Sequence, residues 1–169
     1  MSKSQANNLS LWNTFKQADS SGKIALILST WFGIGLLPGI PGTFGTLAAV
    51  PLMLVLSRLT ILQKTIALVI IVIVAIWSSG RVQDILGKKD PPEVVIDEVA
   101  GFALTMFFLS STWLTFVLGF TLFRFFDILK PFPIRHLEKI RTGFGIVFDD
   151  LLAGLYAFAG VEIILILLR

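Results

Sequence analysis

The chain has 169 residues, of which 55% are hydrophobic and 15% are charged, with a mean hydropathy of +0.86 and a net charge of +3. This composition is far too apolar for an ordinary soluble domain, and the length suits a single domain. The absence of cysteine excludes disulfides, zinc–thiolate sites and cysteine nucleophiles, and the single histidine, His136, excludes any mechanism that needs two. No aromatic residues alternate with basic ones in the pattern typical of nucleic-acid binding.

The first 22 residues are polar and lead into no compact apolar run of the kind found in a removable signal peptide. We therefore predict a polar N-terminal segment over residues 1–22 and a single helical membrane domain over residues 23–169. No internal repeat or low-complexity tract indicates a further division.

Four apolar stretches follow, and they predict an all-α, multi-helix membrane bundle. They cover residues 44–56, 62–77, 99–126 and 151–168. The segments between them, residues 33–45, 78–98 and 124–150, contain almost every side chain able to do chemistry.

The third apolar stretch is expected to fold back on itself. As one straight helix it would place Asp97 and Asp127 about 45 Å apart, on opposite sides of a membrane. Hydroxyl residues at positions 110–112 compete for backbone hydrogen bonds, and a helix can restart on a Ser or Thr cap. We predict a central helical hairpin with arms at residues 98–109 and 113–128, each arm short for a bilayer core of roughly 30 Å.

The distribution of basic residues supports this hairpin, because Lys and Arg concentrate in cytoplasmic loops. With the N-terminus inside and the hairpin dipping in from the same side, only Arg58, Lys64 and Arg169 lie outside. A straight third span would instead separate residues 124–141 from Arg81 and weaken the asymmetry. The pattern predicts a multi-pass protein, in contact with membrane lipids, whose polar segments face the cytoplasm.

Acidic residues gather at the expected helix ends. Asp97 and Glu98 are expected to open the hairpin, Asp127 to close it, and Asp149 and Asp150 to open the last helix. Carboxylates brought to one face repel each other unless a cation joins them, and oxygen ligands of this type suit Mg²⁺. Simple capping by either pair is the alternative, although an anion at a helix C-terminus, such as Asp127, is disfavoured by the helix dipole.

Two cationic side chains flank Asp127 and are candidate phosphate contacts. Arg124 lies three residues before Asp127, which places the two on one helix face, and Lys130 lies three residues after it. Arginine can hold two phosphate oxygens, whereas lysine supplies a point charge. Extension of these long side chains toward the membrane interface is the alternative.

A glycine-rich stretch at residues 39–46 leads into the first apolar segment. Its backbone N–H groups and the hydroxyls of Thr43 and Thr46 are candidate anion ligands at a helix N-terminus. Such stretches also occur for helix packing alone, and the Gly-Lys-Ser/Thr ending of a Walker loop is missing. With cysteine and paired histidines absent, metal-assisted hydrolysis is the simplest reaction class.

Motifs in chain order over residues 33–154 resemble the phosphatidylglycerophosphatase A family. The motifs are GTFGTLAA at residues 42–49, DP at 90–91, VIDEVAG at 95–101, FRFFDILKP at 123–131 and GIVFDD at 145–150.

The resemblance implies an all-helical enzyme of the bacterial inner membrane that removes the terminal phosphate of phosphatidylglycerophosphate, giving phosphatidylglycerol, with Mg²⁺ required. It implies a catalytic and metal-binding site at the cytoplasmic face, formed by Asp97, Glu98, Asp127, Asp149 and Asp150. Arg124 and Lys130 are the implied phosphate contacts.

Two other functions remain open at this point. One is a phosphatase of another phosphomonoester lipid, since a metal site recognises only the phosphate. The other is a small transporter or assembly subunit whose buried acids carry protons or ions. The attacking group, water or an aspartate, and the oligomeric state are not defined by the sequence.

Overall fold

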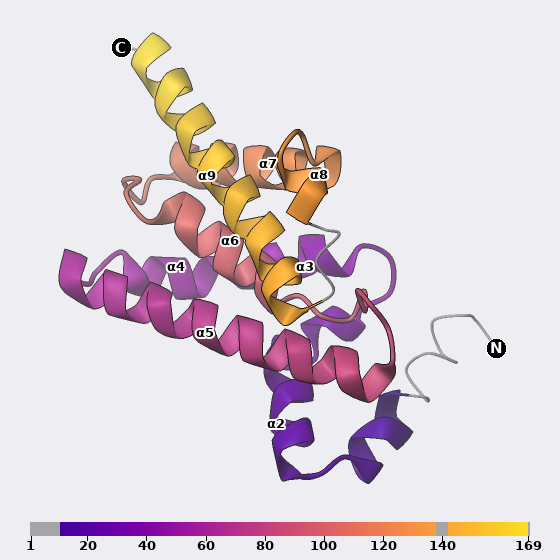
Figure 1. The fold of residues 1–169 in the computed structure, drawn as a ribbon. Coiled ribbons are helices and arrows are strands. Elements are labelled where there is room, and N and C mark those ends of the chain that lie inside the picture. The colour runs from indigo at the N-terminus through magenta and orange to yellow at the C-terminus, as the bar shows by residue number, and fades with distance from the viewer. Residues whose placement is uncertain (1–10, 138–141, 169) are drawn as a thin grey trace.

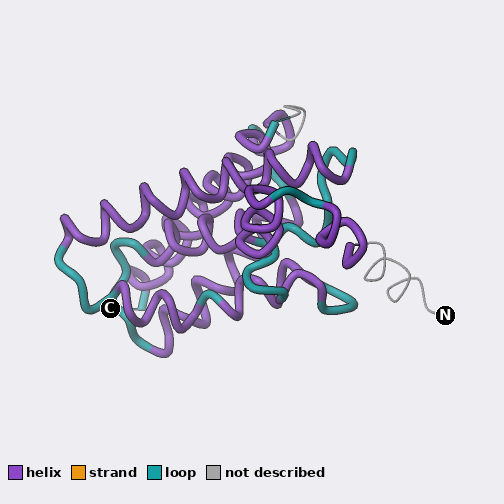
Figure 2. Tube along the Cα trace, turned by 90° about the horizontal axis from the view of Figure 1, so that it is seen from below, coloured by secondary structure: helices purple, strands orange, loops and turns teal. Residues whose placement is uncertain are grey.

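The computed structural model describes residues 11–137 and 142–168, and this part of the chain consists of helices joined by loops, with no strand (Figures 1 and 2). The expected all-α class is therefore confirmed. Two helices, α5 (Ile61–Leu86) and α9 (Gly143–Leu167), are long and apolar enough to cross a membrane.

The segment expected to be polar and separate contains a helix over residues 11–17 and the start of α2 (Ser20–Ser29). Asp19 caps α2 by accepting a hydrogen bond from the Gly22 N–H, and its carboxylate lies 3.1 Å from the Arg81 guanidinium of α5. Leu11 is buried in a cluster with Leu26, so this segment packs on the rest of the protein. The proposed boundary at residue 22 falls within α2, and the division itself stays a prediction.

The first apolar stretch forms two short helices in place of the single span that we expected. They are α3 (Pro41–Ala48), preceded by the short 3-10 helix η1 (Ile34–Leu36), and α4 (Val50–Leu56). Pro51 lacks an N–H and its ring opposes the carbonyl four residues earlier, which interrupts a continuous helix. Residues 41–56 would reach only about 24 Å, less than the roughly 30 Å of a bilayer core.

Helix α5 extends beyond the apolar run that predicted it. It begins at Thr60, where a reciprocal cap with Gln63 satisfies the first turn, and it ends at Gly87 in the left-handed conformation (φ 62°). The sequence prediction ended this helix at Trp77. It continues because Ser78 and Ser79 are buried against the protein.

The central hairpin is confirmed. Its arms are α6 (Ile96–Met106) and α7 (Trp113–Leu129), and Thr112 caps α7 in a reciprocal arrangement with Thr115. The helix therefore restarts on a hydroxyl cap, as predicted. The short helix α8 (Ile134–Leu137) follows the hairpin.

Helix α9 packs against α5, α6 and α7 and forms the centre of the bundle (Figure 1). Close approach depends on glycine: Gly154 lies against the backbone of Gly101, and Gly143 lies against the backbone of Gly80. The Thr105 hydroxyl donates a hydrogen bond of 3.2 Å to the Gly154 carbonyl. Small residues and hydroxyl bonds of this kind are typical of helix packing in membranes.

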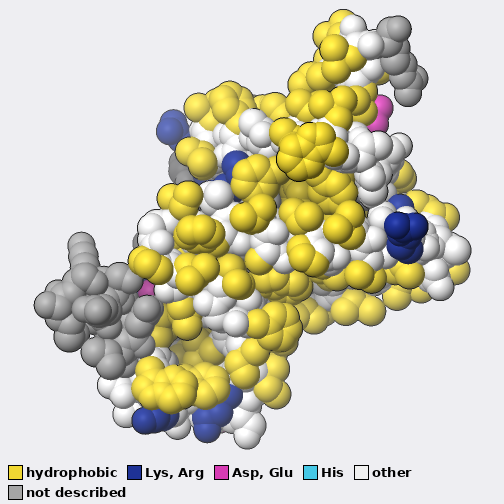
Figure 3. Space-filling model, turned by 180° about the vertical axis from the view of Figure 1, so that it is seen from behind, with side chains coloured by type: hydrophobic (Ala, Val, Ile, Leu, Met, Phe, Trp, Pro, Cys, Tyr) yellow, Lys and Arg dark blue, Asp and Glu magenta, His cyan; other side chains and the backbone are white. Residues whose placement is uncertain are grey.

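The outer surface is rich in exposed apolar side chains, as the face drawn in Figure 3 illustrates. Along α5, Ile66, Val69 and Ile73 are each more than half exposed. Contiguous apolar surface on this scale is rare on soluble monomers and suits contact with lipid.

Candidate active site

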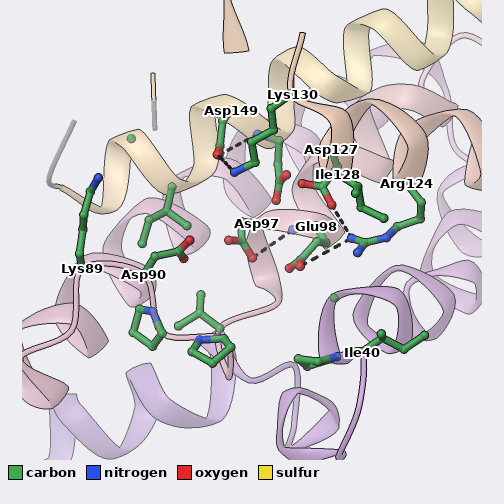
Figure 4. A pocket seen from close by; sticks show the side chains of 18 of the residues that line it. Ile40, Lys89, Asp90, Asp97, Glu98, Arg124, Asp127, Ile128, Lys130 and Asp149 are labelled. Atoms are coloured by element: carbon green, nitrogen blue, oxygen red, sulfur yellow. Dashed lines mark hydrogen bonds and ion pairs between the residues drawn. The ribbon is translucent and has the colours of Figure 1, made fainter. Parts of the chain in front are cut away.

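A pocket of about 470 Å³ lies where several helix ends meet (Figure 4). Its walls are the start of α3, the loop before α6, the first turn of α6, the last turn of α7 and the N-terminal part of α9. Asp97 and Asp127 both line it, although 30 residues of chain separate them. The expected convergence of the hairpin ends is therefore confirmed.

All five predicted carboxylates line this pocket: Asp97, Glu98, Asp127, Asp149 and Asp150. Three of them, Asp97, Glu98 and Asp150, each offer an oxygen within 4.8 Å of the other two. Asp97 and Glu98 occupy the first turn of α6, so helix capping remains a contribution there.

Asp149 and Asp150 do not open the last helix, contrary to the sequence prediction. Helix α9 instead begins at Gly143, with Thr142 as the N-cap residue, and Gly143 packs closely against the backbone of α5. The two aspartates lie in the second turn and are buried. Capping of the helix N-terminus therefore does not explain them.

The two predicted cations point into the acidic cluster. Arg124 Nη1 lies 2.5 Å from Asp127 Oδ2 and 3.8 Å from Glu98 Oε1, and its side chain is 15% exposed. Lys130 Nζ lies 2.7 Å from Asp149 Oδ2. Arg124 is thus held within the pocket by its ion pairs with Asp127 and Glu98.

Burial opposes ionisation of the α6 carboxylates. Burial raises the pKa of Glu98 to about 8, and the negative charges of Asp150 and Asp127 act in the same direction. Burial also raises the pKa of Asp97 well above its usual range, and the charge of Glu98 adds to this effect. Both groups are therefore destabilised as anions in the absence of a cation.

The residues present fit a hard divalent cation. The Asp97, Glu98 and Asp150 oxygens lie within 4.8 Å of one another, and carboxylate oxygens are the ligands that Mg²⁺ takes in proteins. In addition, Glu98 Oε2 is buried and has no hydrogen-bond partner among the described residues. A cation at this point would satisfy that oxygen.

The structure does not bring the hydroxyls of Thr43 and Thr46 to the pocket. Thr46 is fully buried, and its hydroxyl donates a hydrogen bond of 2.9 Å to the Gly42 carbonyl one turn earlier. Neither threonine is among the residues that line the cavity. The glycine-rich stretch instead contributes Gly39, Ile40, Pro41 and Gly42.

Lys89 and Asp90 also line the pocket, on the side away from Arg124 in Figure 4. Neither was a predicted site residue. The DP motif at residues 90–91 was visible in the sequence, but its position in a polar loop gave no indication of where the side chain would lie. The charge of Asp90 contributes to the raised pKa of Asp97.

The fold and the pocket together define a class: a helical protein with a lipid-compatible exterior and an acidic, cation-flanked cavity suited to a phosphate ester. The chain belongs to the phosphatidylglycerophosphatase A family, whose model matches residues 27–165. It is a phosphatase acting on a phosphomonoester, which removes the non-enzymatic alternative.

Three relatives support this assignment. Phosphatidylglycerophosphatase A of Haemophilus influenzae is 38% identical over 134 residues, covering 78% of this chain and 82% of the relative. Phosphatidylglycerophosphatase A of Escherichia coli is 31% identical over 137 residues, covering 80% and 79%. A Bacteroides thetaiotaomicron protein named "Putative phosphatidylinositol-3-phosphatase" is 36% identical over 143 residues, covering 80% and 89%. No solved structure matches the chain.

Proposed function

We propose that this protein hydrolyses phosphatidylglycerophosphate to phosphatidylglycerol and phosphate, in a Mg²⁺-dependent reaction of bacterial phospholipid biosynthesis. The observation that carries the proposal is the meeting of Asp97, Glu98 and Asp150 oxygens within 4.8 Å of one another, in a pocket that also holds Arg124 and Lys130. The identity of the lipid substrate is inferred from two relatives that are named phosphatidylglycerophosphatase A.

Asp97, Glu98 and Asp150 would hold the metal, with Asp127 and Asp149 beside them. When bound, Mg²⁺ supplies Lewis-acid stabilisation of the negative charge on the phosphate. Gly42 leaves room at this point, because a side chain there would overlap Glu98 Oε1.

Arg124 and Lys130 orient the phosphate in this proposal. Arg124 is paired with Asp127, and Lys130 is paired with Asp149. A phosphate entering the pocket would accept charge-assisted hydrogen bonds from the two cations, in place of these carboxylates or together with them. Phosphoryl transfer depends mainly on positioning and charge stabilisation, which these two side chains provide. Their pairing with Asp127 and Asp149 keeps them in place before the substrate arrives.

We place the protein in the bacterial inner membrane as a multi-pass protein, with the pocket at the cytoplasmic face. Supporting this, α5 and α9 are long and apolar enough to span, and most Lys and Arg fall on one side. Lys89 from the loop before α6, and Arg124 and Lys130 from the end of α7, line the pocket, so basic residues lie beside it.

Phosphate release by purified protein, with and without Mg²⁺, tests the proposal. We expect release from phosphatidylglycerophosphate only with Mg²⁺. The variants Asp127→Asn and Asp149→Asn should abolish release while the protein stays folded in detergent. Full activity in both variants would reject the proposed site. Full activity in the presence of a chelator would reject the requirement for Mg²⁺.

A second candidate is hydrolysis of another phosphomonoester lipid, since the Bacteroides relative is named for an inositol lipid. Comparing release from phosphatidylglycerophosphate, phosphatidylinositol 3-phosphate and phosphatidic acid separates these substrates. A preference for either of the last two would replace the first proposal.

A further inference from the structure

An apolar groove of about 460 Å³ runs between the α3–α4 pair and α7. Its walls include Leu47, Val50 and Leu54 on one side and Val117 and Phe120 on the other. Its lining contains no charged residue, and the polar members are Ser and Thr alone: Ser111, Thr112 and Thr121.

The groove starts beside the phosphatase pocket. On α7, Thr121 lines the groove and Arg124, one turn later, lines the pocket. On α3, Gly42 lines the pocket and Leu47, five residues later, lines the groove. On both helices, residues of the two cavities therefore lie within five positions of each other.

On α7 the groove lining runs from Trp113 to Thr121, a rise of about 12 Å. From Arg124 back to Trp113, at its far end, α7 rises about 16 Å. One leaflet contributes about half of a hydrocarbon core of roughly 30 Å. In phosphatidylglycerophosphate, a glycerol, a second phosphate and the glycerol backbone separate the terminal phosphate from the acyl chains. With that phosphate at Arg124, an acyl chain would therefore lie in the part of the groove nearest Trp113.

We propose that this groove holds an acyl chain of the lipid substrate while its phosphomonoester lies in the pocket. The proposal rests on the proposed lipid phosphatase activity. The groove lining carries no charged residue, and Arg124 lies one turn beyond its last residue on α7, an arrangement that matches an acyl chain joined to an anionic head group. A zwitterionic lipid of the surrounding bilayer would fit the apolar groove, but it lacks the phosphomonoester that the neighbouring pocket would bind.

Filling the groove should impair hydrolysis of long-chain lipids selectively. We expect Val117→Trp to raise the KM for a diacyl phosphatidylglycerophosphate about tenfold or more, the effect of displacing two or more methylene groups from an apolar site. Hydrolysis of a dihexanoyl version of the same lipid, whose short chains would occupy less of the groove, should be affected much less. Val69→Trp is the matched control, because Val69 is 51% exposed on α5, Val117 is 40% exposed, and Val69 does not line the groove.

Two results would overturn the proposal. One is an unchanged KM for the diacyl lipid in Val117→Trp, and the other is an equal loss with both lipids, which would indicate damage to the pocket. Absence of phosphate release from either lipid by the wild-type protein would instead reject the proposed function.

Photo-crosslinking of the wild-type protein gives a test that does not depend on a variant folding. A phosphatidylglycerophosphate with a diazirine on its acyl chain should label residues 47–54 and 113–121, and unlabelled phosphatidylglycerophosphate should compete. A diazirine-bearing phosphatidylcholine should label the exposed face of α5 as readily as the groove. Equal labelling patterns for the two lipids would show a groove open to any bilayer lipid and would contradict the proposal.

Discussion

Gly42, in the first turn of α3, lies directly against Glu98 of α6. A Cβ at position 42 would overlap Glu98 Oε1 and come within 3.0 Å of Arg124 Nη1. The glycine therefore sets the distance between the start of α3 and the charged cluster.

We expect Gly42→Ala to lower phosphate release about tenfold or more, because small displacements of positioning groups have effects of this size or larger. Release at saturating Mg²⁺, measured beside the melting temperature in detergent, checks this. Gly80→Ala is the control, since a Cβ there would meet Gly143 at an ordinary 3.6 Å. Wild-type activity in Gly42→Ala would mean that Glu98 and Arg124 need not hold their positions.

Asp150 is the carboxylate whose loss should weaken the metal most clearly, because it is buried and joins the cluster from a different helix. Asp150→Asn should raise the Mg²⁺ concentration for half-maximal release about tenfold or more, since altered metal-site groups commonly cost 10- to 100-fold in affinity. Glu162→Gln, in the same helix but outside the pocket, is the control. An unchanged Mg²⁺ dependence would remove Asp150 from the metal site.

Much of the fold was predictable because hydrophobic runs and caps act locally. The hairpin followed from the hydroxyl residues at positions 110–112, and the confirmed cap is Thr112. The ends of α5 and α9 were misplaced, because they depend on packing between distant segments. Gly143 lies against the backbone of Ile76 and Gly80 in α5, and the sequence does not indicate this partner.

The carboxylates were predictable as site candidates because charge is scarce in so apolar a chain. The sequence did not show whether Thr43 and Thr46 bind an anion or serve helix packing, since a hydroxyl near a helix start can do either. Thr46 bonds within its own helix, whereas Asp90 reaches the pocket from a loop. Loop conformation is set by tertiary contacts, so the sequence gives little information about it.

Gly154 and Gly101 bring α9 and α6 into backbone contact. Gly154→Ala should destabilise the protein by about 1–3 kcal/mol, because overpacking a close contact has this cost. Thermal or chemical unfolding in detergent measures it. Gly160→Ala should have less effect, because its added Cβ would meet only the end of the flexible Leu122 side chain. Equal destabilisation by both variants would point to helix propensity and not to the contact.

The raised pKa of Glu98 predicts how stability depends on pH. The native carboxyl holds its proton up to about pH 8, whereas the unfolded one releases it near 4.5. The native state therefore binds more protons between these values, and stability should fall as pH rises through this window in EDTA. Asp97, with its pKa raised in the same direction, should add to the decline.

Mg²⁺ should reduce the decline in stability by stabilising the ionised carboxylates, and Glu98→Gln should make the decline shallower in EDTA. Melting temperatures from pH 5 to 8 measure both effects, and identical slopes for wild type and Glu98→Gln would show that Glu98 does not titrate in this range.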